Sequence, residues 1–224
     1  MKKPGRKTVK AARPARRRSG ALETGSRERL FAAAAAEFAA RGFAGANVDR
    51  IARAAHVNKA MIYYHFKSKA ALYQEILGEM FHAVGERIRA VAASDATPQQ
   101  KLTQFVAAIA EAAEARPHFP PIWFREIAEG GVHLADATLR DIAGIVQTLV
   151  RILQEGVAAG QFRPINPVLV HGSIIAPLLL FFASGPVRRR LQQRAGLPGF
   201  AELKRDDVVA HIQRVTLGLV EGKL

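Results

Sequence analysis

The chain has 224 residues, enough for one large domain or two small ones, and its 49% hydrophobic residues can bury a sizeable core. The absence of cysteine excludes disulfides, thiolate chemistry and cysteine-ligated zinc, and it fits a reducing cytoplasm. The net charge of +14 is uneven: residues 1–25 carry +8, residues 26–70 carry +5 and residues 71–224 carry +1. A merely solvated basic protein would spread its charge, so this asymmetry indicates nucleic acid at one end of the molecule.

The first 25 residues are rich in Lys, Arg, Pro, Gly and Ala. They contain too few large apolar side chains to order themselves, so we expect a disordered basic arm that adds non-specific affinity for DNA. The arm lacks the apolar segment of a secretory signal. The most apolar stretch, residues 168–183, is short for a bilayer span, so we expect no membrane partner.

A helical pattern begins at Ser26. Leu30, Ala34 and Phe38 recur at every fourth position, which places them on one face of a helix. Gly42 can take the positive φ that ends many helices, so the sequence predicts that this first helix ends there.

The next two predicted helices have helix-turn-helix spacing. Each has about eight residues, and they begin at the N-cap candidates Asn47 and Asn58. A turn at His56 and Val57 separates them, as in a helix-turn-helix. Short helices with tight turns also occur as plain packing units, so the spacing alone does not settle the function.

The outward face of the third helix favours DNA binding. With Ile62 and Phe66 facing the core, the outward positions hold polar and aromatic side chains that suit phosphates and base edges in a major groove. Amides at the helix start, next to Asn58, also point toward a phosphate. The outward residues are Lys59, Met61, Tyr63, Tyr64 and His65.

After residue 70 the sequence predicts mainly helices and no strand. We expect an all-α fold of about nine helices, three in the basic part and six after it. Thr97 and Gln100 can form a capping box around Pro98. The six later helices begin after Ser68, at Thr97, at Phe119, near Leu139, at Asn166 and at Asp206.

Two of these helices are unusually apolar. Residues 166–184 are apolar nearly all round, and residues 206–221 carry a wide apolar stripe. We predict that both helices from each subunit form a four-helix dimer interface across a two-fold axis; the alternative is that both are intramolecular core. The expected interface residues are Ile174, Leu178, Phe181, Val208, Ile212, Val215 and Leu219.

A ligand pocket is the third feature expected in this region. Aromatic side chains can line an apolar cavity in which a few polar groups orient the ligand. Aromatic residues at helical spacing are more often ordinary core, which is the alternative. The pocket candidates are Phe105, Trp123, Phe124, Phe181 and Phe182, with His82, His118 and Glu126 as polar anchors.

The stretch from Arg27 to Leu72 carries a specific set of residues. These are Phe38, Gly42, Phe43, Ile51, Ala52, Ala55, Val57, the run from Ile62 through Tyr63, Tyr64 and His65 to Phe66, and then Lys69 and Leu72. With this set, the stretch resembles the DNA-binding domain of the tetracycline-repressor (TetR/AcrR) family of bacterial regulators. The resemblance covers about a fifth of the chain, by the usual size of such a three-helix unit.

Carried over by position, the resemblance implies a role for each matching residue. Phosphate contacts are implied for Asn47, Tyr63, His65 and Lys69, and base or groove contacts for Lys59, Met61 and Tyr64. With Asn58 these residues form the candidate DNA-binding set.

Three positions depart from the family pattern. Ala60 stands where the family often has Gly, and Asn47 stands where Thr is usual. His56 stands where the turn usually has Gly. If that position needs positive φ, histidine tolerates it at some cost.

The resemblance also implies the organisation and function of the whole chain. We expect a basic arm over residues 1–25, a helix-turn-helix domain over 26–70, and a helical ligand-binding and dimerisation domain over 71–224. The implied function is a sequence-specific transcriptional regulator, and specifically a repressor that a small apolar or amphipathic ligand releases from its operator. The partners would be a pseudo-palindromic operator, a second copy of the chain and an effector, in the bacterial cytoplasm at the nucleoid.

An enzyme is the first alternative. The sequence holds no His-Glu-x-x-His, no glycine-rich phosphate loop and no Gly-x-Ser-x-Gly. His118 and His133 could ligate a metal, but lone histidines are usually surface or core residues. We therefore expect no catalytic, cofactor-binding or metal-binding residues.

A non-specific nucleoid-type protein is the second alternative. Such a protein would bind all DNA alike through its basic arm. It would need no charge-balanced domain of about 150 residues, by the usual size of one domain.

Overall fold

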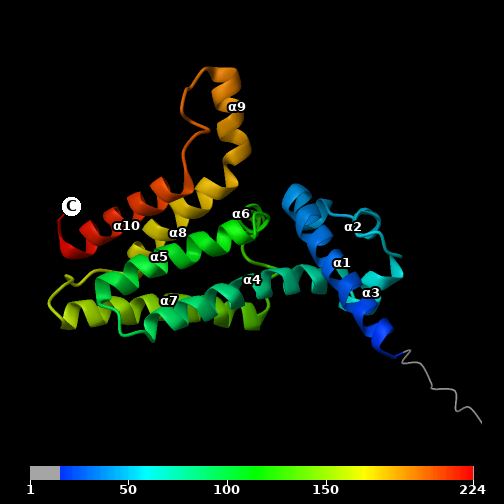
Figure 1. Ribbon diagram of the computed structural model, residues 1–224, viewed down its shortest axis with the longest axis horizontal. Helices are drawn as coiled ribbons and strands as arrows, with labels where there is room; N and C mark the ends of the chain where they lie inside the picture. Colours follow the sequence, from blue (N-terminus) through cyan, green and yellow to red (C-terminus); the bar gives the residue numbers. More distant parts are fainter. Residues whose placement is uncertain (1–15, 224) are drawn as a thin grey trace, which may run out of the picture.

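The computed structural model describes residues 16–223, with side chains from residue 25 onward, and it is all helical over this range. The all-α prediction is confirmed. Figure 1 shows α1 to α3 gathered at one end of the molecule and the remaining helices at the other. The helices are α1 (Arg16–Gly45), α2 (Val48–Ala54), α3 (Ala60–Phe66), α4 (Lys69–Ala92), α5 (Pro98–Ala115), α6 (Phe119–Ala128), α7 (Asp136–Ala158), α8 (Pro167–Ala183), α9 (Gly185–Ala195) and α10 (Arg205–Glu221).

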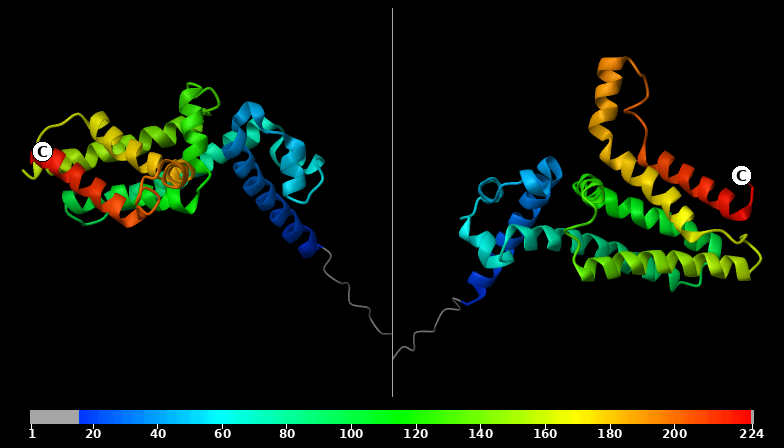
Figure 2. Two further views of the ribbon diagram at one scale, coloured as in Figure 1. Left: turned by 90° about the horizontal axis from the view of Figure 1, so that it is seen from above. Right: turned by 180° about the vertical axis from the view of Figure 1, so that it is seen from behind.

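The expected count of nine helices was wrong, because the described residues form ten. The missed helix is α9, which has no buried residue and therefore no apolar stripe for a sequence pattern to detect. It leaves α8 at an angle of 60° and projects from the bundle (Figures 1 and 2).

The first helix also begins earlier than expected. α1 starts at Arg16 rather than Ser26, so residues 16–25, which were assigned to the disordered arm, form its first turns. The rest of the predicted arm, residues 1–15, lies outside the described residues.

Helices α1, α2 and α3 form a small unit around its own apolar centre. Leu30 and Phe38 from α1, Ile51 from α2 and Ile62 from α3 are fully buried there. The helical conformation of α1 breaks at Gly42, where φ is 69°, so the predicted positive φ is confirmed.

The second part of the chain is a bundle with α5 at its centre. α5 packs against α4, α7, α8 and α10, so Leu102, Phe105 and Ile109 lie in the middle of the core. The predicted capping box is present at the start of α5, where Thr97 and Gln100 bond each other's backbone amides.

Two helices connect the parts. α4 begins beside α1 and α3 and continues along α7 and α5, and α6 contacts both α1 and α8 (Figure 2). α4 therefore gives a covalent connection, and α6 gives a packed one.

None of the described helices is by itself long and apolar enough to span a bilayer. The pair α8 and α9 reaches the required length and composition only when the two are taken together across their bend.

Candidate nucleic-acid interface and ligand cavity

The helix-turn-helix depends on two local features. The Asn47 side chain accepts hydrogen bonds from the amides of Asp49 at 2.7 Å and Arg50 at 3.3 Å, so the predicted N-cap of α2 is confirmed. His56 has a φ of 53°, so the turn does need the left-handed region that glycine adopts most freely. The turn forms with histidine at some cost in conformational energy.

Helix α3 begins at Ala60, slightly later than expected. Its N-cap residue is Lys59 and not Asn58 as predicted, although the Asn58 side chain accepts the amide hydrogen of Ala60 at 2.8 Å. Ile62 and Phe66 are buried, as predicted. The structure therefore orients the opposite face of α3 toward solvent.

The candidate DNA-binding side chains differ in how free they are. Tyr63 and Tyr64 are 48% and 67% exposed, whereas Met61 is half-buried against the core. Lys59 is exposed and its Nζ lies 3.0 Å from Asp49; this hydrogen bond raises the pKa of the lysine. The two tyrosines thus form the most accessible part of the surface.

The two remaining candidates, His65 and Lys69, are tied to the protein. His65 is half-buried, and its Nε2 lies 2.9 Å from the hydroxyl of Ser26. Lys69 donates to the carbonyl of Ala46 at 3.0 Å, and its Nζ lies 4.6 Å from the centre of the Phe43 ring. Both side chains therefore help to hold the helix-turn-helix unit together. This structural role is separate from the predicted contacts with phosphate.

Glu37 fixes α2 against α1. It accepts the amide hydrogen of Asn47 at 3.1 Å and pairs with Arg50 at 2.6 Å. Burial opposes the charged form, but the bonds from Arg50 and Asn47, with the charges of Arg50 and Arg41, outweigh it and lower the pKa of this carboxyl.

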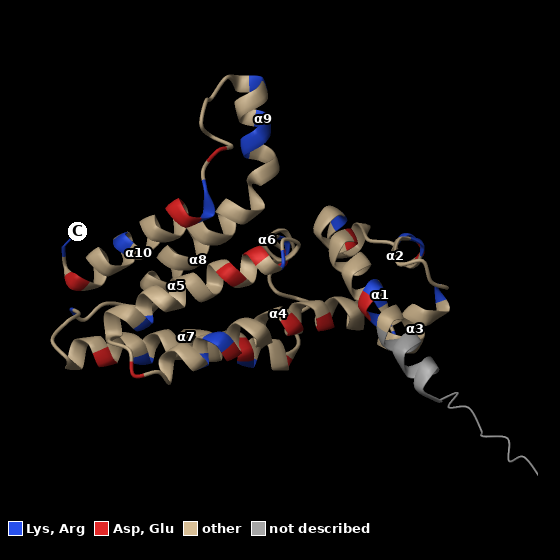
Figure 3. Cartoon of the chain, in the orientation of Figure 1, with Lys and Arg blue, Asp and Glu red and all other residues tan. Residues whose placement is uncertain are grey.

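Two exposed basic residues of this unit, Arg53 and Lys67, are not among the predicted DNA contacts. Arg53 lies near the end of α2, and Lys67 follows α3 with a φ of 67°. Figure 3 shows blue segments, which mark Lys and Arg, on the ribbon at α2 and near α3. In the sequence, Arg53 and Lys67 are marked only by their positive charge. Charge alone does not distinguish a side chain that contacts phosphate from one that is merely solvated.

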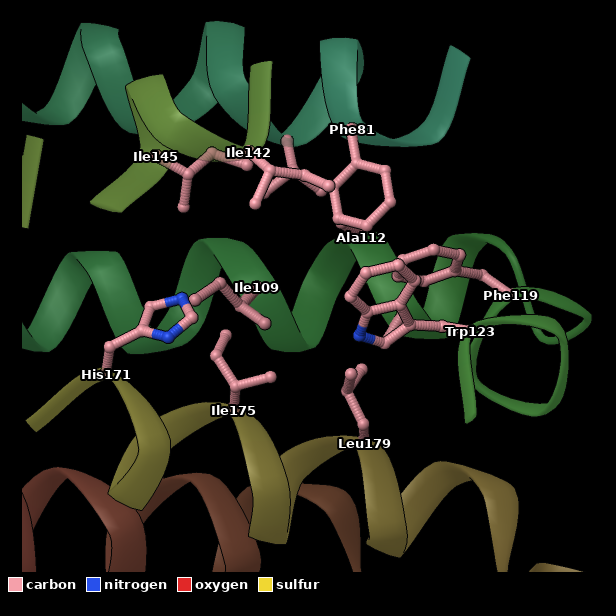
Figure 4. A pocket seen from close by; sticks show the side chains of 12 residues that line it. Phe81, Ile109, Ala112, Phe119, Trp123, Ile142, Ile145, His171, Ile175 and Leu179 are labelled. Atoms are coloured by element: carbon pink, nitrogen blue, oxygen red, sulfur yellow. The ribbon is translucent and has the colours of Figure 1, made fainter. Parts of the chain in front are cut away.

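The second candidate site is a cavity of about 60 Å³ inside the bundle (Figure 4). Helices α4, α5, α6, α7 and α8 all contribute to its wall. The lining residues are Phe81, Val84, Ile109, Ala112, Ala113, Phe119, Trp123, Ile142, Ile145, His171, Ile175 and Leu179.

Of the eight predicted pocket residues, only Trp123 lines this cavity. Phe105 and Glu126 are buried elsewhere, and His82 and His118 are exposed. Phe124 and Phe182 pack against the core, and Phe181 faces a separate groove formed by α8, α9 and α10. The polar residue that lines the cavity is His171, whose signal in the sequence was its place in an otherwise apolar helix.

A polar cluster lies where α6 meets the DNA-binding unit. Glu126 is fully buried; its carboxylate accepts from the Tyr73 hydroxyl at 3.1 Å and from the His133 amide at 2.8 Å. Its Oε2 also lies 3.1 Å from Nδ1 of His133, whose ring is 4.2 Å from that of Phe43. Burial, and then the carboxylate of Glu126, raise the pKa of Tyr73 far above its usual value.

Among the described residues, this cluster has the side chains and spacing that could hold a metal ion. Ligand atoms of Glu126, Glu129 and His133 lie within 4.8 Å of one another. Glu126 is already bonded by Tyr73 and His133, which explains the cluster without an ion.

Helix α6 touches both sites. Phe119 and Trp123 face the cavity, whereas Arg125 donates to the carbonyl of Ala40 at 3.2 Å, close to the break in α1. α6 therefore joins the cavity wall to the DNA-binding unit, as does α4, which lines the cavity with Phe81 and Val84 and packs against α1 and α3.

The predicted dimer surface needs a correction. Ile174, Leu178 and Ile212 are buried within their own subunit, so their side chains are not available to a second copy. Phe181, Val208 and Leu219 are half-buried, and Val215 is exposed. The apolar residues of α8 that do face solvent are Val168, Leu169, Ala176, Pro177 and Leu180.

Two family models match the chain, one over the helix-turn-helix unit and one over the helical bundle. Residues 30–76 match the family model described as "Bacterial regulatory proteins, tetR family". Residues 98–195 match "Tetracyclin repressor-like, C-terminal domain".

Curated relatives match over most of the chain. The transcriptional repressor KstR2 of Mycolicibacterium smegmatis is 33% identical over 62% of this chain and 68% of its own length. The repressor NicS of Pseudomonas putida is 28% identical over 70% of this chain and 74% of its own. Both are named as regulators and not as enzymes.

Solved structures share the fold. The ketosteroid transcriptional regulator KstR2 of Mycobacterium tuberculosis is 25% identical, with a TM-score of 0.68 over 87% of this chain and 94% of its own. A putative fatty acid metabolism regulator of Clostridium perfringens gives the same TM-score at 22% identity, over 86% of this chain and 98% of its own. With its helix-turn-helix, its helical bundle and these relatives, the chain belongs to the TetR family of DNA-binding transcriptional regulators.

Proposed function

We propose that the chain is a homodimeric repressor that binds a pseudo-palindromic operator and is released by a small apolar or amphipathic ligand. The observation that carries this proposal is the double contact of α6, which lines the cavity with Trp123 and bonds α1 through Arg125. The named repressors among its relatives support repression rather than activation. The family of bacterial regulators supports action at the nucleoid, in the cytoplasm.

The proposed DNA contacts divide by chemistry. Phosphate contacts position the protein and carry no sequence information, whereas contacts with base edges discriminate between sequences. We assign Asn47, Asn58, Tyr63, His65 and Lys69 to the first group. Lys59, Met61 and Tyr64 form the second group.

The proposed dimer uses the exposed face of α8 beside α10. Leu169, Ala176 and Leu180 recur on that face, and Val215 lies on α10. Exposed apolar side chains in such a row are typical of an interface. A two-fold axis through it would present two α3 helices to DNA, which is why the operator should be pseudo-palindromic.

The proposed release follows from linkage. A ligand that binds more tightly to the DNA-incompetent shape must weaken DNA binding by the same factor by which DNA weakens ligand binding. α6 has the cavity on one side and the end of α1 on the other. It therefore gives the coupling between ligand and DNA binding a short physical path.

The DNA-binding half of the proposal is tested by selection. The full chain is incubated with a pool of random duplexes, and bound sequences are recovered over several rounds. We expect a pseudo-palindrome whose two halves are centred about one helical turn apart or a multiple of it. The recovered site should stay bound in excess random DNA; equal affinity for all duplexes would instead identify a non-specific nucleoid-type protein.

A further inference from the structure

The cavity wall excludes charge. Ten of its twelve lining side chains contain only carbon and hydrogen, and no Lys, Arg, Asp or Glu is among them. An ionised ligand buried here would lose its hydration without gaining a counter-ion, which costs several kcal/mol. The wall therefore favours a neutral ligand.

Two lining side chains nevertheless carry polar atoms. The ring of His171 and the indole N–H of Trp123 face the cavity (Figure 4), and neither makes a hydrogen bond to any described residue. Burial lowers the pKa of His171, so its ring is neutral near pH 7 and can donate from one nitrogen and accept at the other. The indole of Trp123 can only donate.

These two groups lie at opposite ends of the cavity. Figure 4 shows Trp123 beside Leu179, two turns along α8 from His171. At 1.5 Å per residue, His171 and Leu179 are about 12 Å apart along the helix axis. A ligand that satisfies both groups must be elongated, with an oxygen near each end.

The cavity must also widen to admit such a ligand. Its volume of about 60 Å³ is well below the roughly 150 Å³ of an apolar cavity that holds one benzene ring. Trp123 is half-buried, whereas Phe119, the other wall residue on the short helix α6, is buried; the same helix carries Arg125, which bonds the Ala40 carbonyl of α1.

We propose that the cavity binds a neutral, elongated, mainly apolar molecule with a hydrogen-bonding oxygen at each end, one accepting from Trp123 and the other paired with His171. The proposal rests on the ligand-controlled release proposed above and specifies the class of ligand. It distinguishes the effector from hydrocarbons, which satisfy neither group, and from carboxylates, which bring a charge.

The test uses simple probes on the full-length protein. Hexanediol, octanediol and decanediol with terminal hydroxyls are titrated while the fluorescence of Trp123, the sole tryptophan, is followed. Octanol, octane and octanoate are compared at the same chain length. We expect a diol to bind most tightly, with octane and octanoate weaker by about tenfold or more, and the diol to release operator DNA.

Variants assign the two ends. His171→Leu should reduce diol binding to about the level of octanol, a loss of about five- to tenfold, while octane binding stays unchanged. His171→Gln keeps a polar group and should recover part of the loss. Trp123→Phe removes the donor and the fluorophore, so its effect is measured as a weaker release of operator by the diol.

Three outcomes would overturn the inference. If octane bound as well as the diols and His171→Leu changed nothing, the polar groups would not select the ligand, although ligand-controlled release would stand. If octanoate bound more tightly than the diols, the cavity would accept anions. If no probe quenched Trp123 while the operator remained bound, the cavity would not be the effector site, and specific DNA binding would be unaffected.

Discussion

Ile62 is buried in the core of the helix-turn-helix unit, and its neighbour Tyr63 lies on the exposed face proposed to contact DNA. Because the Tyr63 side chain is exposed and contributes little to the core, Tyr63→Phe removes a hydroxyl without disturbing the fold. We expect operator and random DNA to be weakened by the same factor, about tenfold for a charge-assisted bond to phosphate. Fluorescence anisotropy at one salt concentration measures both affinities.

Lys59 should behave differently. If it contacts a guanine, Lys59→Ala should lose about 1–3 kcal/mol of discrimination between operator and random DNA. Asp49→Ala is the matched control, because it removes the ion-pair partner and leaves the lysine free. A Lys59→Ala variant with an unchanged specificity ratio and a normal melting temperature would show that this side chain does not contact bases.

His171 makes the stability of the protein depend on pH. Because burial lowers its pKa, the unfolded chain takes up a proton more readily than the folded one. Its contribution is therefore complete above the ordinary pKa of about 6.5 and is lost as pH falls toward the lower folded value. His171→Leu should flatten the decline in melting temperature below about pH 6.5, whereas the exposed His118→Leu should follow wild type.

At this scale the sequence predicted which side chains of α3 are buried and which are exposed better than it predicted the lining of the cavity. The inward positions Ile62 and Phe66 follow from helical periodicity, which then leaves the tyrosines outside. Whether an aromatic side chain lines a cavity or fills the core depends on packing between distant helices, and periodicity carries no such information. Phe105 and Trp123 were both predicted to line the cavity as aromatic residues of helices, yet only Trp123 does.

Among the helices, α6 is the element whose contacts predict coupling. Arg125→Met removes the hydrogen bond to the Ala40 carbonyl and keeps most of the side-chain volume. We expect an alkanediol to quench Trp123 as in wild type but to lower operator affinity several-fold less. Arg116→Met, which removes an exposed ion pair with Glu79, is the control. Full release by the diol in Arg125→Met would place the coupling elsewhere.

The end of α7 depends on a glycine. A Cβ at Gly156 would lie 1.9 Å from the Phe162 ring, which folds back onto the helix there. Gly156→Ala should therefore lower the free energy of unfolding by about 1–3 kcal/mol, since the ring or backbone must shift. Gly144→Ala, in the same helix with its nearest atom at 3.8 Å, should instead raise it by about 0.5–1 kcal/mol. Urea unfolding of the two variants compares them directly.

The starts of three capped helices were predictable, and helix α9 was not. Thr97, Asn166 and Asn47 form caps in the structure because a capping bond is local and involves neighbouring residues. α9 packs no residue into the core, so no periodic apolar signal marks it. Its four arginines resemble a solvated loop in the sequence.

For the whole molecule, the exposed face of α8 predicts the assembly. Leu169 is 66% exposed in the subunit, so Leu169→Glu leaves the core intact while placing a charge in the proposed interface. We expect this variant to be a folded monomer by light scattering and to bind the operator weakly. Val132→Glu, at a site 72% exposed after α6, should remain dimeric. A dimeric Leu169→Glu variant would move the interface to another face.

The length of α4 converts a small disturbance into a large one. With 24 residues the helix is about 36 Å long, and it carries the DNA-binding unit at its first turn. Tilting such a lever by about 5° about its far end moves the first turn by about 3 Å, as much as one hydrogen bond is long. In a dimer with a two-fold axis both levers tilt by the same angle, so the span between recognition helices changes by up to about 6 Å against a DNA repeat of about 34 Å. Release from the operator then requires only a change of angle, with every helix intact.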